Sequence, residues 1–170
     1  QTAETQNEES RDGGAGGTLV AYFTYAENAD LPEGIDASAS ASIQSWNGEV
    51  TGNTGAVAHM IGEETGGELF SIRTVEKYPD SYDDTVDQGQ EEQREDARPQ
   101  LETHIENLED YGTVFLGYPN WWGDMPMAVY SFLEEYDLSG KTVIPFVTSG
   151  GERIFRYRQP DRGAPARCGC

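Results

Sequence analysis

The chain has 170 residues, of which 36% are hydrophobic, and it carries a formal net charge of −20 at pH 7. This length suits one domain with a hydrophobic core, and the sequence shows no internal repeat and no apolar run long enough to span a membrane. The negative charge argues against nucleic acid or anionic lipid as a partner. It favours basic protein partners, unless the acidity only aids solubility.

The amino-terminal segment, residues 1–17, contains no aromatic and no branched aliphatic residue. It cannot bury apolar surface, so we predict a disordered tether. A polar tether at an end without methionine is typical of a secreted or lipid-anchored protein, which favours an extracytoplasmic location over a cytoplasmic one. A cloning choice explains the same facts.

The first predicted strand is Thr18–Phe23, which is apolar almost throughout and therefore central in its sheet. The segment Ala29–Val50 is small, polar and serine-rich, and we interpret it as an inserted surface loop. Thr51–Thr54 then opens a helix that ends at Gly66. A hydroxyl- and glycine-rich turn before a helix suits a phosphate, because free N–H groups and the helix dipole point at the anion.

The middle of the chain predicts structural elements with no chemical site of their own. Glu68–Arg73 is the second predicted strand, Tyr82–Arg98 a strongly charged helix, and Leu101–Leu108 a further short helix. We interpret the carboxylates of the charged helix as a solvated face and not as a metal or acid/base site. His59 and His104 have no evident catalytic or metal partner in the sequence.

A third apolar run, Thr113–Leu116, predicts a strand buried on both faces. It leads into a glycine-containing loop with two adjacent indoles, Trp121 and Trp122. Ligands of open parallel sheets bind at the carboxyl ends of the strands, so a flat aromatic ligand stacked here is one interpretation. The alternative is that the indoles cap the core or face a partner.

A helix over Met125–Tyr136 and a fourth strand over Thr142–Val147 follow, and this strand ends in the small residues Thr148–Gly151. Buried strands separated by helices predict an α/β fold, a doubly wound parallel sheet in a three-layer α/β/α arrangement. The site then lies at the carboxyl edge of the sheet. Phosphate-binding and ring-binding loops together indicate flavin mononucleotide (FMN).

The order LVAYFT, TGNT, FLGYPNWWGDMPM and DLSGKTVIPFVTSGG resembles the flavodoxin family, in the branch whose second loop reads Tyr-Pro-x-Trp-Trp-Gly. The resemblance covers residues 18–151, the expected FMN-binding domain. It implies a flavodoxin-like fold with strand order 2-1-3-4, normally followed by strand 5, bound FMN, and transfer of one or two electrons.

The same resemblance implies which residues contact the cofactor. The first loop and helix start are expected to hold the phosphate, the second loop to flank the isoalloxazine, and the third to meet the other edge of the ring. The insertion splits the first loop and leaves open which residues of Tyr25–Asn28 contact the phosphate. The expected FMN-binding residues are Thr24, Tyr25, Ala26, Asn28, Asn53, Thr54, Pro119, Asn120, Trp121, Trp122, Gly123, Ser149, Gly150 and Gly151.

Residues 152–170 depart from the family and carry five of the chain's 11 basic residues, together with both cysteines. A back-translation with synonymous codons, shifted by one base, reads Gly-Ser-Gly-Phe, which resembles the family's continuation. We interpret the tail as frameshifted, with a real basic tail as the alternative. A sheet that stops at the fourth strand leaves an apolar edge, and a homodimer is one way to cover it.

Three functions remain in view. The leading one is an FMN-dependent electron carrier that meets redox proteins through a basic docking face on the partner. The alternative is an NAD(P)H-dependent reductase of FMN or quinones at the same site. A second alternative is a non-redox module that binds a planar ligand or a protein. No catalytic side chain and no metal site is proposed.

Overall fold

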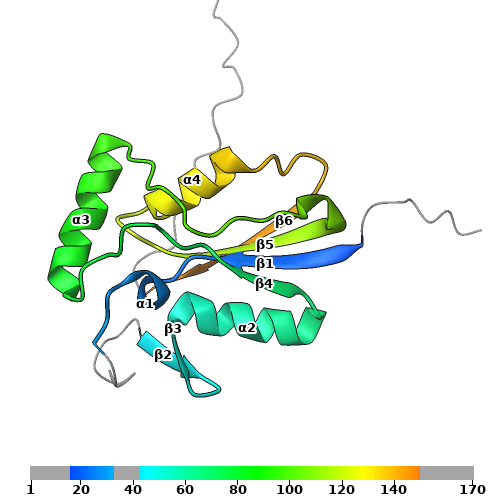
Figure 1. Ribbon diagram of the computed structural model, residues 1–170, viewed down its shortest axis with the longest axis horizontal. Helices are drawn as coiled ribbons and strands as arrows, with labels where there is room; N and C mark the ends of the chain where they lie inside the picture. Colours follow the sequence, from blue (N-terminus) through cyan, green and yellow to red (C-terminus); the bar gives the residue numbers. More distant parts are fainter. Residues whose placement is uncertain (1–15, 33–42, 150–170) are drawn as a thin grey trace, which may run out of the picture.

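A four-stranded parallel sheet forms the centre of the computed structural model, which describes residues 16–32 and 43–149 (Figure 1). The strand order is β4–β1–β5–β6, which is the predicted order 2-1-3-4, and β1 is central as predicted. The strands are β1 (Gly17–Tyr22), β4 (Glu68–Ser71), β5 (Tyr111–Pro119) and β6 (Thr142–Thr148).

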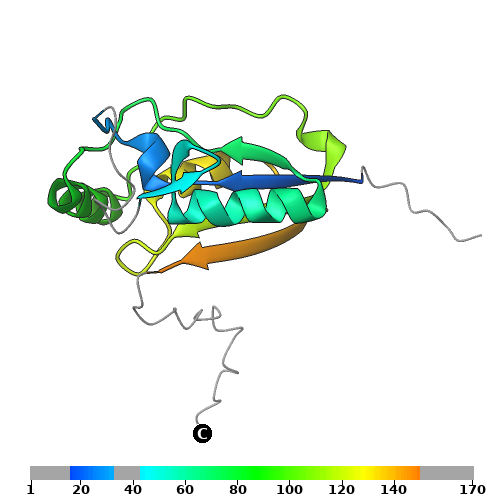
Figure 2. The ribbon, with the colours of Figure 1, turned by 90° about the horizontal axis from the view of Figure 1, so that it is seen from below.

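Helices cover both faces of the sheet and confirm the three-layer arrangement. α2 (Asn53–Thr65) lies on one face and α4 (Met127–Glu135) on the other (Figures 1 and 2). Alternate residues of a strand point to opposite faces, so Val20 packs with Ala58 of α2 while Leu19 belongs to the cluster around Phe132 of α4. The apolar run of β1 therefore fills two cores at once.

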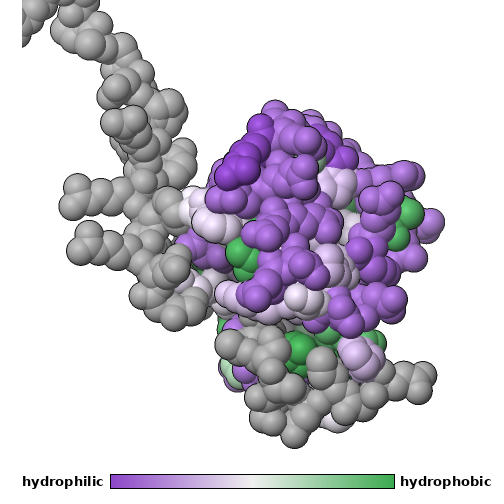
Figure 3. Space-filling model, turned by 90° about the vertical axis from the view of Figure 1, so that its left-hand side faces the viewer, coloured by the Kyte–Doolittle hydropathy of each residue, from purple (hydrophilic) through white to green (hydrophobic). Residues whose placement is uncertain are grey.

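The third long helix, α3 (Tyr82–Glu95), lies beyond the carboxyl ends of the strands (Figure 2). It begins where the Ser81 side chain accepts a hydrogen bond from the Asp84 backbone, and it ends at Asp96, whose φ of 51° is left-handed. The predicted helix over Tyr82–Arg98 is thus shorter at its carboxyl end. The surface on this side is mostly hydrophilic (Figure 3), as the charged sequence indicated.

The prediction of a surface loop over Ala29–Val50 is wrong in its last part, where the chain forms two strands. β2 (Ile43–Trp46) and β3 (Glu49–Gly52) form an antiparallel hairpin. Asn47 and Gly48 make its turn with φ of 50° and 88°, the Asn-Gly combination that type I′ turns favour. Ile43 anchors the hairpin with 1% exposure.

Two further predictions need correction. Residues 25–28 form a short helix, α1 (Tyr25–Asn28), at the end of β1. The predicted helix over Leu101–Leu108 is absent, and only a 3₁₀ turn, η2 (Leu108–Asp110), follows there. The extended chain instead donates from the Glu102 backbone to the Arg73 carbonyl and from the Thr103 hydroxyl to the Ser71 carbonyl. These tertiary hydrogen bonds override the local helical preference.

The ends of the chain bear on the predicted domain limits. The predicted tether, residues 1–17, and the tail, residues 152–170, lie outside the described residues except for Gly16 and Gly17, and Gly17 already belongs to β1. Within the described part, β6 is an edge strand, and Val143, Ile144 and Val147 on it are 39–44% exposed. No helix in residues 16–32 and 43–149 has the length and apolar character to cross a membrane.

Candidate functional site at the carboxyl edge of the sheet

The ends of β5 and β6 and the start of α2 are joined at one edge of the sheet. The hydroxyl groups of Thr54 and Thr148 lie 2.7 Å apart, which connects the start of α2 to the end of β6. The Asn120 backbone donates to the Thr148 carbonyl at 2.8 Å, which connects the loop after β5 to the same strand. The three predicted loops therefore meet, as the carboxyl ends of parallel strands must.

The start of α2 combines a helix end that has no side-chain cap with buried hydroxyl groups. Gly52 is the N-cap residue and has no side chain to satisfy the first amides of the helix. Thr51 and Thr54, on either side of it, are 2% and 1% exposed. Gly55 allows the close packing, because a Cβ at that position would lie 2.0 Å from the Thr51 Oγ1. This geometry suits an anion.

The side chains of α1 serve the fold around this helix start. Tyr25 is buried, and its hydroxyl donates to the Pro79 carbonyl at 2.7 Å. The Asn28 amide, which is fully buried, donates to the Thr24 and Ile72 carbonyls at 3.0 Å each and accepts from the Thr74 backbone at 2.9 Å. Ala26, another expected FMN-binding residue of α1, is also buried. A ligand phosphate would therefore meet backbone groups here.

Trp121 is partly buried and packs against the core. Its ring is edge-on to Phe23 and to Tyr78, each with centroids 5.4 Å apart and interplanar angles of 89° and 84°. The same indole packs on Gly89 of α3, where a Cβ would lie 3.3 Å from it. Of the two interpretations of the tryptophan pair, capping of the core describes Trp121.

Trp122 is the exposed member of the pair, with 49% of its surface accessible. Trp121 and Asp124 exchange backbone hydrogen bonds of 2.9 and 3.0 Å, so Trp122 and Gly123 form a tight turn with φ of 51° and 89°. Positive φ at both positions is typical of a type I′ turn, but rare for so bulky a residue. The Trp122 Nε1 donates to the Val86 carbonyl at 2.9 Å and holds the ring against α3.

Asp124 fixes the end of this turn. Its Oδ1 accepts from the Met125 backbone at 2.8 Å, and both carboxylate oxygens accept from the Tyr130 hydroxyl at 2.9 Å. Burial first, and then the hydrogen bond to Asp124, raise the pKa of Tyr130 to about 12. The helical pattern indicated Tyr130 only as a packing residue, and its contact with Asp124 is visible only in the folded chain.

Asn120 carries the one buried side-chain polar atom of the described residues that has no hydrogen-bond partner, its Oδ1. A buried acceptor without a donor costs free energy, so it fits a ligand that brings an N–H or O–H group. Pro119 precedes Asn120 at the end of β5, Gly123 lies in the turn that follows, and Ser149 is exposed directly after β6. Gly150 and Gly151 lie outside the described residues.

A pocket of about 210 Å³ lies elsewhere, between Leu19, Phe70, Ile105 and Tyr111. Leu19 and Tyr111 belong to the amino-terminal halves of their strands, so this pocket is at the opposite edge from the loops. In the described parts of the chain, no group of three or more His, Cys, Asp or Glu side chains is arranged to hold a metal.

Comparison with known proteins gives a consistent picture. A family model described as Flavodoxin matches residues 47–163. Solved flavoproteins of Bacteroides eggerthii and Bacteroides uniformis are similar to the chain at 29% identity, both with a TM-score of 0.61. The alignments cover 81% and 82% of this chain and 74% and 76% of theirs.

A flavoprotein of Lactobacillus acidophilus, solved in complex with FMN, aligns with a TM-score of 0.58 at 19% identity over 80% of this chain and 76% of its own. At that identity the likeness extends to the fold alone. No curated protein matches the chain.

Proposed function

The chain belongs to the flavodoxin family, and from that membership we propose that it binds FMN at the carboxyl edge of its sheet and carries electrons. The observation that carries the proposal is the meeting of the α2 start, with its buried threonine hydroxyls, and the unpartnered Asn120 Oδ1 at this one edge. The first feature suits the phosphate of FMN and the second suits its donor groups.

At the phosphate end, the residues that bind are the first amides of α2 and the hydroxyls around them. Thr24 and Thr54 are 2% and 1% exposed, so a phosphate held there is largely withdrawn from water. Hydrogen bonds from neutral donors and the helix dipole then replace its hydration without a lysine. Among the described residues, Arg73 is the basic side chain tied to this region, through its contact with Glu27.

At the ring end, the loop Asn120–Asp124 is stiffened by its own contacts. The Trp121 side chain packs against the core, and the Asp124 carboxylate accepts from the Tyr130 hydroxyl. A rigid loop loses little entropy when a ligand binds, and it excludes water from one face of the ring. FMN, when bound, supplies the redox chemistry, and the protein binds it, orients it and excludes water.

A carrier is favoured over an enzyme by what surrounds the site. The side chains nearest the site, Asp124, Thr148 and Tyr130, are engaged in hydrogen bonds of the fold. The strongly charged helix α3 lies next to the ring loop, since the Trp122 Nε1 donates to the Val86 carbonyl of that helix. An acidic surface beside the site suits encounter with a basic redox protein.

The test is an optical titration of the purified chain with FMN and with riboflavin. We expect uptake of FMN with the visible spectrum of a protein-bound flavin, and weaker uptake of riboflavin because the phosphate contacts are lost. A chain that stays colourless and quenches neither flavin overturns the proposal. If the FMN-loaded chain catalyses steady-state oxidation of NADH or NADPH with FMN or a quinone as acceptor, the protein is a reductase and not a simple carrier.

A further inference from the structure

Glu27 holds a nearly buried carboxylate that the proposed FMN site does not use. Its side chain is 10% exposed. The two oxygens accept from the Tyr22 hydroxyl at 3.1 and 3.2 Å, from the Thr51 hydroxyl at 2.9 Å, and from the Ser71 hydroxyl. The Arg73 guanidinium lies 3.6 Å away.

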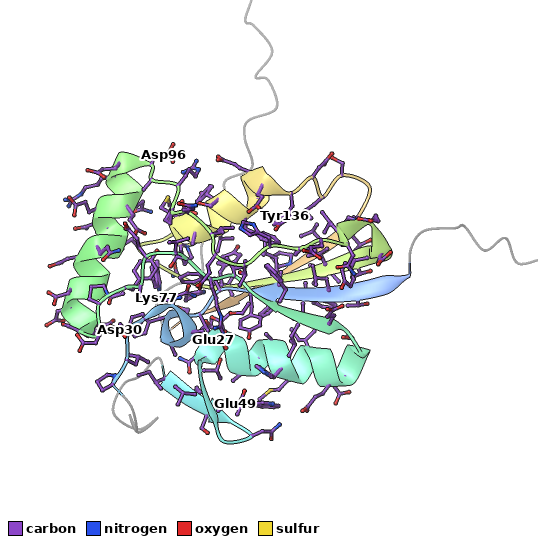
Figure 4. The ribbon with its side chains drawn as sticks, in the orientation of Figure 1. Glu27, Asp30, Glu49, Lys77, Asp96 and Tyr136 are labelled. Atoms are coloured by element: carbon purple, nitrogen blue, oxygen red, sulfur yellow. The ribbon has the colours of Figure 1, made fainter. Side chains whose placement is uncertain are left out.

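A carboxylate in this position needs an explanation, because withdrawal of a charge from water is costly unless donors replace the lost hydration. Here three hydroxyl groups and one cation supply the replacement. They come from different elements: Tyr22 ends β1, Ser71 ends β4, and Thr51 lies in β3 directly before α2. Glu27 itself belongs to α1 (Figure 4).

Thr51 brings this carboxylate to the start of α2. The Thr51 Oγ1 that donates to Glu27 also packs against Gly55 in the first turn of the helix, where there is no room for a Cβ. Glu27 is therefore connected to the first turn of α2 through the Thr51 hydroxyl. Its neighbour Asn28 fixes α1 to Ile72 and Thr74 on the other side.

We propose that Glu27 is a positioning residue for the phosphate of the ligand. The inserted segment divides the phosphate-binding loop into a half after β1 and a half before α2. The carboxylate of Glu27, through Thr51, holds the second half in register with the first. The inference rests on the proposed FMN site, but its structural part is independent of any ligand.

The charge of Glu27 does not oppose this role. An unpaired carboxylate near a phosphate would repel it. Arg73 compensates the charge, and the hydroxyl hydrogens of Tyr22, Thr51 and Ser71 all point at the carboxylate oxygens. Glu27 thus organises these donors around itself.

The test compares two variants that each remove one hydroxyl donor from the same carboxylate. Thr51→Val cuts the connection to α2, and Ser71→Ala cuts the connection to β4 and serves as the matched control. The first readout is the ratio of FMN to riboflavin affinity, which isolates the phosphate. The second is hydrogen exchange of the backbone amides of residues 52–54, measured without flavin.

For Thr51→Val we expect FMN affinity to fall about five- to tenfold, the effect of one lost hydrogen bond, while riboflavin affinity stays within about twofold. Amide exchange at residues 52–54 should rise about tenfold through local opening. Ser71→Ala should change neither the affinity ratio nor this exchange. Glu27→Ala, which removes the acceptor of the Thr51 hydroxyl, should reproduce the Thr51→Val result, and Thr51→Val should add little to it in the double variant.

Equal affinity ratios and equal exchange in Thr51→Val and Ser71→Ala would overturn the positioning role. If the unaltered chain binds no FMN, the proposed function fails on its own, and the exchange comparison still decides the role of Glu27. Slower or unchanged exchange at residues 52–54 in Thr51→Val would then reject it.

Discussion

The hydroxyl groups of Thr54 and Thr148 lie 2.7 Å apart, so the first turn of α2 is hydrogen-bonded to the last residue of β6. Both atoms lie at the carboxyl edge, although the two residues are far apart in the sequence. The contact fixes the distance between the phosphate end and the third loop of the proposed site. This hydrogen bond therefore links the phosphate end of the proposed FMN site to the stability of the edge strand β6.

Thr148→Val keeps the shape of the side chain and removes this hydrogen bond. Thr54 is 1% exposed and would lose its partner, so the free energy of unfolding should fall by about 1–2 kcal/mol. Urea denaturation measures the change. Thr142→Val, at the exposed start of β6, is the matched control and should stay within about 0.5 kcal/mol of the unaltered chain. Equal stabilities of the two variants would contradict the prediction.

Trp121→Ala should destabilise the chain more than it changes any ligand contact. The indole packs against Phe23, Tyr78 and Gly89, and its removal leaves a cavity between the sheet and α3. We expect the free energy of unfolding to fall by about 2–4 kcal/mol. Trp121→Phe keeps an aromatic ring in the cavity and should cost clearly less. A small loss in the alanine variant, with intact α3 signals, would show that the core does not depend on this ring.

Trp122→Ala should have the opposite profile. Its ring is 49% exposed, so the free energy of unfolding should change by about 1 kcal/mol or less. If the ring stacks on bound FMN, the affinity should fall by roughly 1–3 kcal/mol, from lost apolar burial and aromatic contact. Trp122→Phe keeps a ring face but loses the Nε1 donor to Val86. An affinity unchanged in both variants would remove Trp122 from the site.

These two residues also mark the limit of what sequence reasoning predicts. The apolar runs of β1, β5 and β6 and the helices between them predicted a parallel sheet covered by helices, because period and burial decide that much, and the strand order followed from the family resemblance. Trp121 and Trp122 are adjacent residues of the same type. Only the turn, with positive φ at Trp122 and Gly123, directs one ring against the core and leaves the other exposed on α3. No pattern of residue types contains that information.

Other differences have separate physical causes. The hairpin β2–β3 was detectable from Asn47–Gly48, but the serine-rich composition around it indicated a loop. The helix predicted over Leu101–Leu108 fails because backbone groups near Arg73 bind that segment in an extended form. The sequence did not predict a role for Glu27, because that role depends on Thr51 and Ser71, which only the folded chain brings together. Contacts of this kind lie beyond local patterns.

Alkaline pH should destabilise the chain. Burial and the Asp124 hydrogen bond raise the pKa of Tyr130 to about 12, and burial likewise raises the pKa of Tyr22 and Tyr78. A raised pKa means that the folded chain keeps a proton that the unfolded chain loses near pH 10. The stabilisation is therefore complete below about pH 10 and is lost as the pH rises through the folded value.

Tyr130→Phe isolates the contribution of one hydroxyl group to that slope. It should lower the free energy of unfolding at neutral pH, because Asp124 loses a donor, and it should make the decline between about pH 10 and 12 shallower. Urea denaturation at several pH values gives the slope. Tyr82→Phe, whose residue is 62% exposed, should leave the slope unchanged. A decline of equal steepness in Tyr130→Phe and the unaltered chain would contradict the assignment.

Asp124 should also lower the potential at which bound flavin accepts its last electron. Full reduction leaves a negative charge on the flavin ring, and Asp124 ends the turn that is proposed to flank that ring. Two negative charges close together in a partly dry site repel each other. Asp124→Asn keeps an oxygen for the Met125 backbone and the Tyr130 hydroxyl but removes the charge.

Spectroelectrochemistry on Asp124→Asn should therefore give a midpoint potential for the last electron that is higher by tens of mV, the equivalent of roughly 1 kcal/mol for one electron. Glu91→Gln is the matched control, because Glu91 is exposed on α3 and salt screens distant surface charges. Glu92 is unsuitable as a control, since its carboxylate accepts from the Tyr78 hydroxyl at 2.9 Å and supports the core. A potential that moves equally in Asp124→Asn and Glu91→Gln would assign the effect to net charge, and one that moves in neither would leave Asp124 a structural residue of the turn.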